Sequence, residues 1–157
     1  MFWQNFSRQF LWLPVIFLGG LCLLAPPSVS AQKKELDVPP KIVYIPHDNR
    51  PISNEQTAAV ARKLGYEVVV PPADLLGDRQ NLGNPEKLWN WLETNAEGAK
   101  AAVISSDSMV YGSLVGSRKH QETQRVVLER AARFKEFRHL YPGLTVYVFS
   151  SLMRTPK

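Results

Sequence analysis

Residues 41–51 read KIVYIPHDNRP, and this stretch decides the fold class. Its first half, Lys41 to Ile45, is a short run rich in apolar and β-branched residues, which predicts a buried strand. Its second half is polar and ends in a proline, which predicts a loop directly after that strand. The same order, an apolar strand followed at once by polar residues, returns twice further along the chain.

Three further apolar runs predict strands over residues 66–70 (YEVVV), 101–105 (AAVIS) and 144–149 (LTVYVF). These runs are almost continuously apolar, as strands are when both faces of a parallel sheet are covered. Helical segments separate them, so the predicted order is β-α-β-α-β-α-β. We therefore expect an α/β fold with a mainly parallel four-stranded sheet and flanking helices. A Rossmann-like layer and the first half of a β/α barrel both fit this order.

Three helices are predicted between the strands. Ser53 and Gln56 have the spacing of a capping box, which predicts a helix from there to Gly65. Asn84-Pro85 predicts the start of the second helix, and the third is predicted over residues 119–140. The residues predicted to face the core are Val60, Ala61 and Leu64, then Leu88, Trp91 and Leu92, then Val127, Ala131, Phe134 and either Phe137 or Leu140.

Residues 1–31 have the features of an export signal. Arg8 supplies the positive start, residues 10–24 are apolar, and Val29-Ser30-Ala31 suits cleavage after Ala31. The apolar run is shorter than the ~20 residues that a membrane-spanning helix needs. Membrane association is expected only if this segment stays uncleaved as an anchor, which is the weaker interpretation. We expect a periplasmic or extracellular protein, with a linker over residues 32–40 and an α/β domain over residues 41–157.

Composition narrows the classes of function. The 157-residue chain has a net charge of +5, and removal of Arg8 with the signal leaves about +4. This mild excess, without interleaved aromatic and basic residues, does not indicate a nucleic-acid partner. The one cysteine, Cys22, lies in the signal, which excludes disulfides and thiolate metal sites from the mature chain. No cofactor is required by the sequence, and the oligomeric state is not indicated.

Polar residues gather directly after three of the predicted strands. In parallel α/β sheets ligands bind beyond the carboxyl ends of the strands, so we expect the three groups to converge on one site. Asp48 and Asp107 are the candidate catalytic residues, as an acid/base pair of carboxylates. Five further residues are predicted to bind substrate: His47, Arg50, Tyr111, Arg118 and Arg154.

Each of these residues also has a structural interpretation. Asp48 suits turn chemistry, Asp107 suits a cap of the turn that follows it, and His47 suits a structural histidine. No metal ligand set is expected, because no tight spacing of ligand residues occurs. The chain contains neither a P-loop, nor a dinucleotide fingerprint, nor a GxSxG elbow.

Four ordered motifs resemble one family. The stretches KIVYIPHDNRP, VVVPPADLLG, SSDSMVYGSLVGSR and FSSLMRTP, over residues 41–157, are similar to the uncharacterised bacterial family called domain of unknown function 4127. Members usually have Leu-Asp-Asp-Arg-Pro where this chain has residues 47–51, and a double glycine where it has Gly112-Ser113. The resemblance implies a longer protein of which this chain is the N-terminal part. It implies no reaction.

These observations lead to a first hypothesis of an exported hydrolase-like enzyme that acts on an envelope or extracellular glycan or a similar polar polymer. A non-catalytic periplasmic module that binds an anionic small molecule or a saccharide is the alternative. A truncated chain without activity of its own is the third interpretation.

Overall fold

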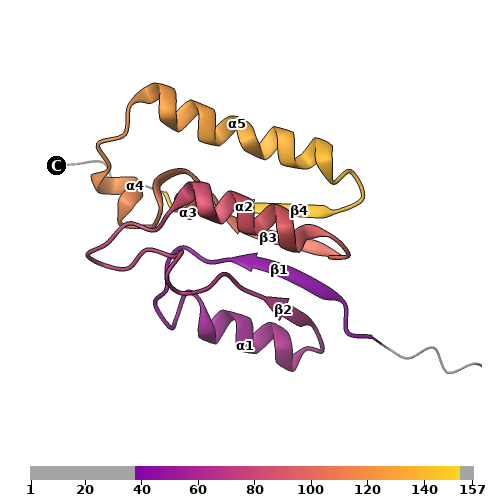
Figure 1. Ribbon diagram of the computed structural model, residues 1–157. Coiled ribbons are helices and arrows are strands. Elements are labelled where there is room, and N and C mark those ends of the chain that lie inside the picture. Colours follow the sequence, from indigo (N-terminus) through magenta and orange to yellow (C-terminus); the bar gives the residue numbers. More distant parts are fainter. Residues whose placement is uncertain (1–37, 153–157) are drawn as a thin grey trace, which may run out of the picture. The chain divides into compact units, whose positions relative to one another are not determined.

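A computed structural model describes residues 38–152 of the chain. The predicted signal segment, residues 1–31, lies outside the described residues, as does most of the predicted linker. The described elements follow the order β1-α1-β2-α2-β3-α3-α4-α5-β4 (Figure 1). The strands are β1 (Lys41–Ile45), β2 (Glu67–Val69), β3 (Ala101–Ser105) and β4 (Thr145–Phe149). The helices are α1 (Glu55–Lys63), α2 (Pro85–Ala96), α3 (Ser106–Tyr111), α4 (Gly116–Lys119) and α5 (Gln124–Leu140).

The four strands form one sheet in the order β2-β1-β3-β4, and every neighbouring pair is parallel. The predicted α/β fold with a parallel four-stranded sheet is therefore confirmed. Strand β1 lies between β2 and β3, so the chain reverses direction across the sheet after β2. This order belongs to a doubly wound sheet and differs from the sequential order of a β/α barrel.

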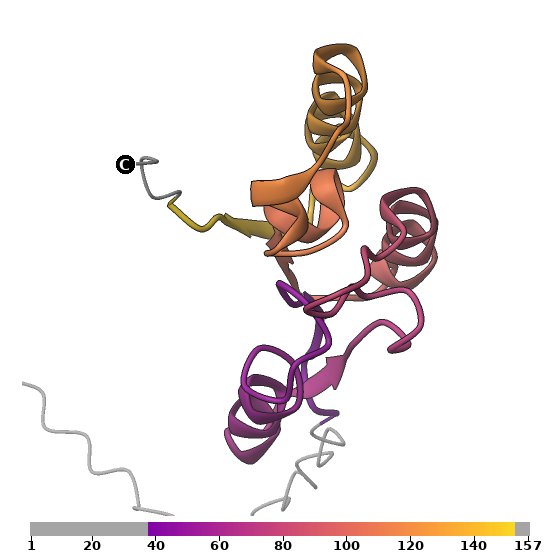
Figure 2. The ribbon, with the colours of Figure 1, turned by 90° about the vertical axis from the view of Figure 1, so that its left-hand side faces the viewer.

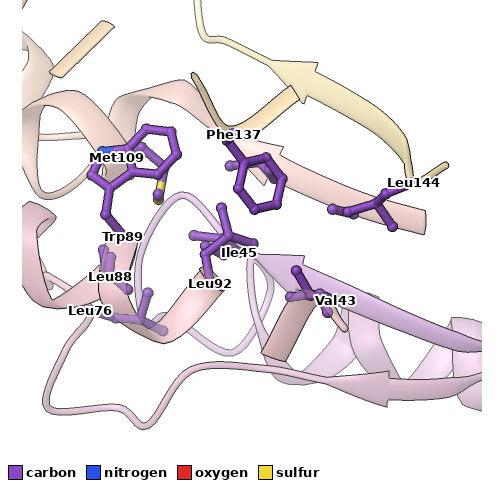
Figure 3. Close-up of a cluster of buried hydrophobic side chains, with 12 residues drawn as sticks. Val43, Ile45, Leu76, Leu88, Trp89, Leu92, Met109, Phe137 and Leu144 are labelled. Atoms are coloured by element: carbon purple, nitrogen blue, oxygen red, sulfur yellow. The ribbon is translucent and has the colours of Figure 1, made fainter. Parts of the chain in front are cut away.

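Helices cover the two faces of the sheet unequally. Helix α1 lies on one face, and α2 and α5 lie on the other (Figures 1 and 2). The larger core lies under α2 and α5, where alternate residues of β1 and β3 meet helical side chains (Figure 3). It contains Val43, Ile45, Leu76, Leu88, Trp89, Leu92, Ala96, Ala102, Ile104, Met109, Phe137 and Leu144. The smaller core under α1 contains Tyr44, Ala58 and Val68.

Helix α2 begins as predicted. The Asn84 side chain accepts a hydrogen bond from the Lys87 backbone N–H at 3.0 Å, and Pro85 occupies the first helical position. Its buried stripe includes Trp89, which is fully buried, whereas the predicted Trp91 is half-buried. The buried face of α2 is therefore rotated relative to the predicted face. Burial of one such large apolar side chain stabilises the fold by about 1.5–3 kcal/mol.

Helix α1 corrects two predictions. The capping box does not form: the N-cap is Asn54, and no side chain caps the helix. Ser53 instead lies in a turn, where its carbonyl accepts the Tyr44 hydroxyl at 2.5 Å. The predicted core residues Val60 and Leu64 are exposed because the helix turns its small residues, Ala58 above all, toward the sheet.

The segment before β4 corrects a third prediction. Helix α5 begins at Gln124 rather than at residue 119, with Thr123 as its N-cap. Residues 106–119, predicted mainly as a loop, contain the short helices α3 and α4. On α5 Phe137 is buried and Val127 and Phe134 are half-buried, but the predicted Ala131 and Leu140 are exposed.

Ion pairs form part of the contact between α5 and α2. Arg130 and Arg133 both bind Glu86, and the Arg133 guanidinium also lies 5.0 Å from the centre of the Trp89 ring.

Among the residues that the structure covers, no helix combines the length and the apolar character needed to cross a membrane.

Candidate functional site

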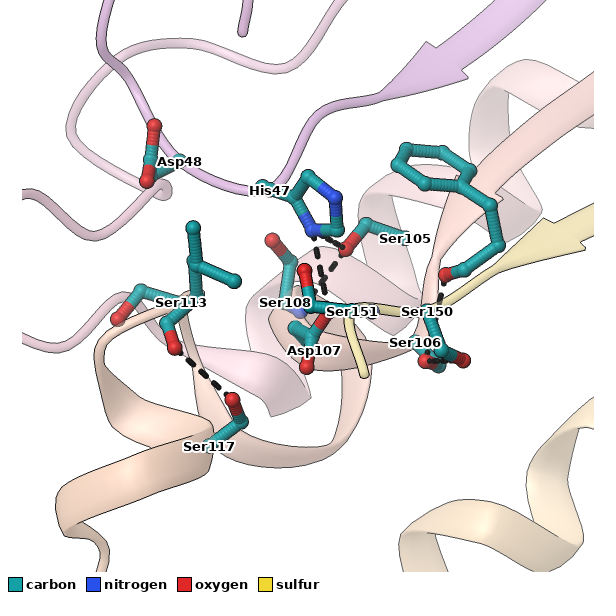
Figure 4. A network of polar contacts seen from close by, with 12 residues as sticks. His47, Asp48, Ser105, Ser106, Asp107, Ser108, Ser113, Ser117, Ser150 and Ser151 are labelled. Atoms are coloured by element: carbon teal, nitrogen blue, oxygen red, sulfur yellow. Dashed lines mark hydrogen bonds and ion pairs between the residues drawn. The ribbon is translucent and has the colours of Figure 1, made fainter. Parts of the chain in front are cut away.

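Some of the polar residues predicted to converge lie together at one edge of the sheet. His47 follows β1, Ser105 ends β3, Asp107 lies two residues later, and Ser151 follows β4 (Figure 4). Strand β3 is the direct neighbour of both β1 and β4, so three loops that are distant in sequence become adjacent at the carboxyl ends of the strands.

His47 and Asp107 form a close pair. The Nδ1 atom of His47 lies 3.1 Å from Oδ2 of Asp107 and 2.9 Å from Oγ of Ser105. The same Asp107 oxygen accepts the Ser151 backbone N–H at 3.0 Å. The histidine is therefore held by a carboxylate that is itself held by the backbone after β4.

This arrangement selects one tautomer of the neutral imidazole. An ionised carboxylate only accepts hydrogen bonds, so the nitrogen that faces Asp107 carries the proton. The Nδ1–H then donates toward Asp107 and Ser105, which leaves the lone pair on Nε2. Within residues 38–152 the Nε2 atom makes no hydrogen bond, and the His47 side chain is 22% exposed. An oriented histidine with a free Nε2 is suited to accept a proton from a bound molecule.

The environment of Asp107 keeps its carboxyl group ionised. Burial alone would raise its pKa, but hydrogen bonds from His47, the Ser151 backbone and Ser117, together with the charge of His47, outweigh burial and lower the pKa below its ordinary value. The carboxylate is nearly inaccessible, at 6% side-chain exposure. These properties suit a group that orients His47 better than one that delivers a proton to substrate.

Phe149 fixes the histidine ring from another side. Its ring meets the His47 ring edge to face, with centres 4.7 Å apart and planes 77° apart. Phe149 in turn stacks on Tyr44 at 6.5 Å. Since aromatic pairs prefer this geometry, His47 has both its hydrogen-bonding edge and its ring plane determined by neighbours.

Asp48 and Arg50 form a second oriented pair. Oδ2 of Asp48 accepts hydrogen bonds from Nε and Nη2 of Arg50 at 2.9 and 2.7 Å, and Oδ1 accepts the Arg50 backbone N–H at 3.2 Å. Asp48 is fully buried, whereas the Arg50 side chain is 30% exposed. The hydrogen bonds that Arg50 donates to Asp48 are the main reason that the pKa of Arg50 is raised.

Close backbone contacts hold these loops in place. Gly83 N–H donates to the Gly112 carbonyl at 3.0 Å, and Asn49 N–H donates to the Gly77 carbonyl at 2.9 Å. A Cβ atom on Gly77 would lie 2.8 Å from the Gly112 carbonyl oxygen. Glycine is therefore required where the loop after β2 meets the loop after α3.

The predicted site residues fall into three groups. His47 pairs with Asp107, and Asp48 pairs with Arg50, but no hydrogen bond joins the two aspartates within the described residues, and in Figure 4 Asp48 lies apart from the contact between His47 and Asp107. Tyr111 packs its ring on His120 instead, with centres 4.6 Å apart. Arg118 is exposed on α4. Arg154 lies outside the described residues. The roles assigned to these residues remain predictions.

Sequence reasoning gave no site role to Ser105, Phe149 and Ser151. Ser105 and Phe149 are the last residues of β3 and β4, and Ser151 acts through its backbone. The available signal was position: a serine or an aromatic residue at the carboxyl end of a parallel strand lies at the same edge of the sheet as the loops.

Two other kinds of site, a metal centre and an open hollow, are less well supported. Within residues 38–152 no group of three His, Cys, Asp or Glu side chains is placed to hold a metal ion. An open hollow of about 610 Å³ lies at the opposite edge, at the amino ends of the strands, with Lys41, Lys100 and Glu67 among its lining residues. It contains no pair of oriented titratable groups, so chemistry rather than volume identifies the candidate site.

Together the doubly wound parallel sheet and the carboxylate-oriented histidine define a class: an α/β protein with a candidate site at the carboxyl ends of its strands. The family model described as "Protein of unknown function (DUF4127)" matches residues 42–157, and the chain belongs to this family. No curated protein and no solved structure matches the chain significantly.

Proposed function

We propose that this protein is an exported hydrolytic enzyme in which His47, oriented by Asp107, is the general base. The observation that carries the proposal is the contact of 3.1 Å between His47 Nδ1 and Asp107 Oδ2, with Nε2 directed away from that contact. Asp–His pairs of this geometry set the tautomer of the base and stabilise the imidazolium that forms during the reaction. Export follows from the signal features of residues 1–31.

The proposed step begins with a water molecule bound at Nε2 of His47. Nε2 takes a proton from the water while the water oxygen attacks the electrophilic carbon of the substrate, and the imidazolium then protonates the leaving group. Asp107 stays ionised throughout, in accordance with its lowered pKa. This assigns Asp107 a positioning role and moves the base from the predicted carboxylate to His47.

The substrate we propose is an envelope or extracellular glycan or a similar polar polymer. Cleavage of a glycosidic bond ordinarily needs two free carboxyl groups, and Asp48 is buried in its pair with Arg50. A single histidine base is instead suited to an ester bond, such as an acyl group attached to a sugar hydroxyl. We therefore place ester hydrolysis on the polymer ahead of chain cleavage.

The test is a hydrolysis screen with the purified protein on 4-nitrophenyl acetate, O-acetylated xylan and a set of 4-nitrophenyl glycosides. His47→Gln should lower the rate by about 10²–10⁴-fold, the usual contribution of a positioned base. His139→Gln is the matched control, because His139 is exposed on α5. Full activity of a folded His47→Gln variant would refute the proposal.

Binding without turnover is the second candidate function. The observation that favours it is the Asp48–Arg50 pair, which presents hydrogen-bond donors without any reactive group. It predicts that no substrate in the screen is hydrolysed and that saccharide or anion binding survives in His47→Gln.

A further inference from the structure

The guanidinium of Arg50 has one edge occupied and one edge open. Its Nε and Nη2 atoms both donate to a single oxygen of Asp48. A guanidinium has five N–H donors, so the two N–H groups of Nη1 and the second of Nη2 remain. Within residues 38–152 Nη1 has no hydrogen-bond partner, and 30% of the side chain is exposed. One N–H of Nη1 and the remaining N–H of Nη2 form the flat edge that binds carboxylate or phosphate through two parallel hydrogen bonds.

The loop does not need this guanidinium in order to close. Asp48 Oδ1 accepts the Arg50 backbone N–H, which makes the turn without the arginine side chain. The Arg50 carbonyl accepts the Ser53 and Asn54 N–H groups at 2.9 Å, and Asn49 is bonded to Gly77. The contact between the two side chains is therefore an addition to a turn that the backbone already completes.

Asp48 holds Arg50 in the manner in which Asp107 holds His47. In both pairs a nearly inaccessible carboxylate binds a partner that is partly exposed, at 30% for Arg50 and 22% for His47. His47, Asp48 and Arg50 all lie in the loop after β1, whereas Asp107 lies in α3. A guanidinium that is fixed before the ligand arrives loses less rotamer entropy on binding than a free arginine side chain.

We propose that Arg50 binds an anionic group of the substrate, a carboxylate or a phosphate ester, through its open Nη1–Nη2 edge. This inference rests on the proposed function and names the substrate class, an anionic polymer. The charge of about +4 on the chain after removal of the signal favours the approach of such a polymer.

The test follows the side-chain Nε–H signal of Arg50 in ¹⁵N-labelled protein during titration with sodium phosphate, galacturonate and neutral galactose at constant ionic strength. We expect a saturable shift with phosphate or with galacturonate, and none with galactose. Phosphate alone would identify a phosphate ester as the group recognised, and galacturonate alone a carboxylate. Arg125 is the matched control, because it also pairs with one carboxylate, Glu129, but on an exposed helix surface. An Arg50 signal that shifts with neither anion, or equal shifts of the Arg50 and Arg125 signals, would overturn the inference.

A second variant separates this inference from the proposed function. Arg50→Lys keeps the charge and loses the fork, and we expect it to weaken binding of the effective anion about 10- to 100-fold. His47→Gln should leave that affinity unchanged and remove turnover. Active His47→Gln protein would refute the base and leave the anion site intact, whereas unchanged affinity in Arg50→Lys would refute the anion site and leave the base intact.

Discussion

The Asp48–Arg50 pair predicts an unequal response to removal of its two partners. Asp48 is fully buried, whereas Arg50 reaches solvent over 30% of its side chain. Arg50→Met leaves a carboxylate buried without its charged partner, which ordinarily costs about 3–5 kcal/mol of unfolding free energy. Asp48→Asn keeps an acceptor for the turn and lets the arginine reach water, so its cost is about 1 kcal/mol.

The assay is urea unfolding at pH 7, followed by tryptophan fluorescence, because Trp89 is fully buried. With a urea dependence of about 2 kcal/mol per molar, the two midpoints should differ by roughly 1–2 M. Arg125→Met is the control for an exposed pair and should cost about 0.3–0.5 kcal/mol.

The double variant tests the same reasoning. Once Asp48→Asn has removed the buried charge, Arg50→Met should cost far less than it does alone, so the two effects should not add. Equal costs for the two single variants, or strict additivity, would show that burial of Asp48 does not decide the energetics of the pair.

Three further predictions concern the site and its supports. The pKa of Asp107 is lowered in the folded protein. The contribution of Asp107 to stability is therefore complete above the pKa of an unfolded aspartate, about 3.9, and is lost as the pH falls through the lower folded value. Below about pH 4 in acid unfolding, Asp107→Asn should lose less stability than the unaltered protein, and parallel curves of the two proteins would contradict this. Long-range ¹H–¹⁵N spectra of neutral His47 should show the proton on Nδ1, and Asp107→Ala should populate the Nε2–H form; a proton on Nε2 in the unaltered protein would disprove the assigned tautomer. Gly112→Ala should cost about 2–4 kcal/mol, because Gly112 has a φ of +87° and a Cβ there would lie 2.8 Å from the Gly83 oxygen; Gly98→Ala, with a φ of +70° and nothing within 4 Å, should cost only about 1 kcal/mol in the same unfolding assay.

The strands were predictable from the chain because they are local patterns. The apolar runs at 41–45 and 101–105 match β1 and β3 to the residue. Faces of helices were less predictable: Leu64 was expected in the core and is exposed, while Trp89 was not expected and is fully buried. Which face a helix buries depends on the neighbour it meets, and the sequence of the helix itself does not contain that neighbour.

The sequence predicted where in the fold the site lies, but not which of its residues contact one another. The rule that ligands bind beyond the carboxyl ends of parallel strands brought His47 and Asp107 into one region. The pairing within that region was not predicted, since Asp48 and Asp107 were expected to act together. Asp48 instead binds Arg50, two residues away, because a turn places their side chains side by side.

The sequence by itself determined that strands and helices alternate, that polar residues follow the strands, and that the chain resembles its family. These properties depend on residues close together along the chain. Only the tertiary structure decided that His47 is paired with Asp107, because that contact spans sixty residues and exists only when β1 and β3 lie side by side. The proposed chemistry depends on that contact, which sets which nitrogen of His47 carries the proton.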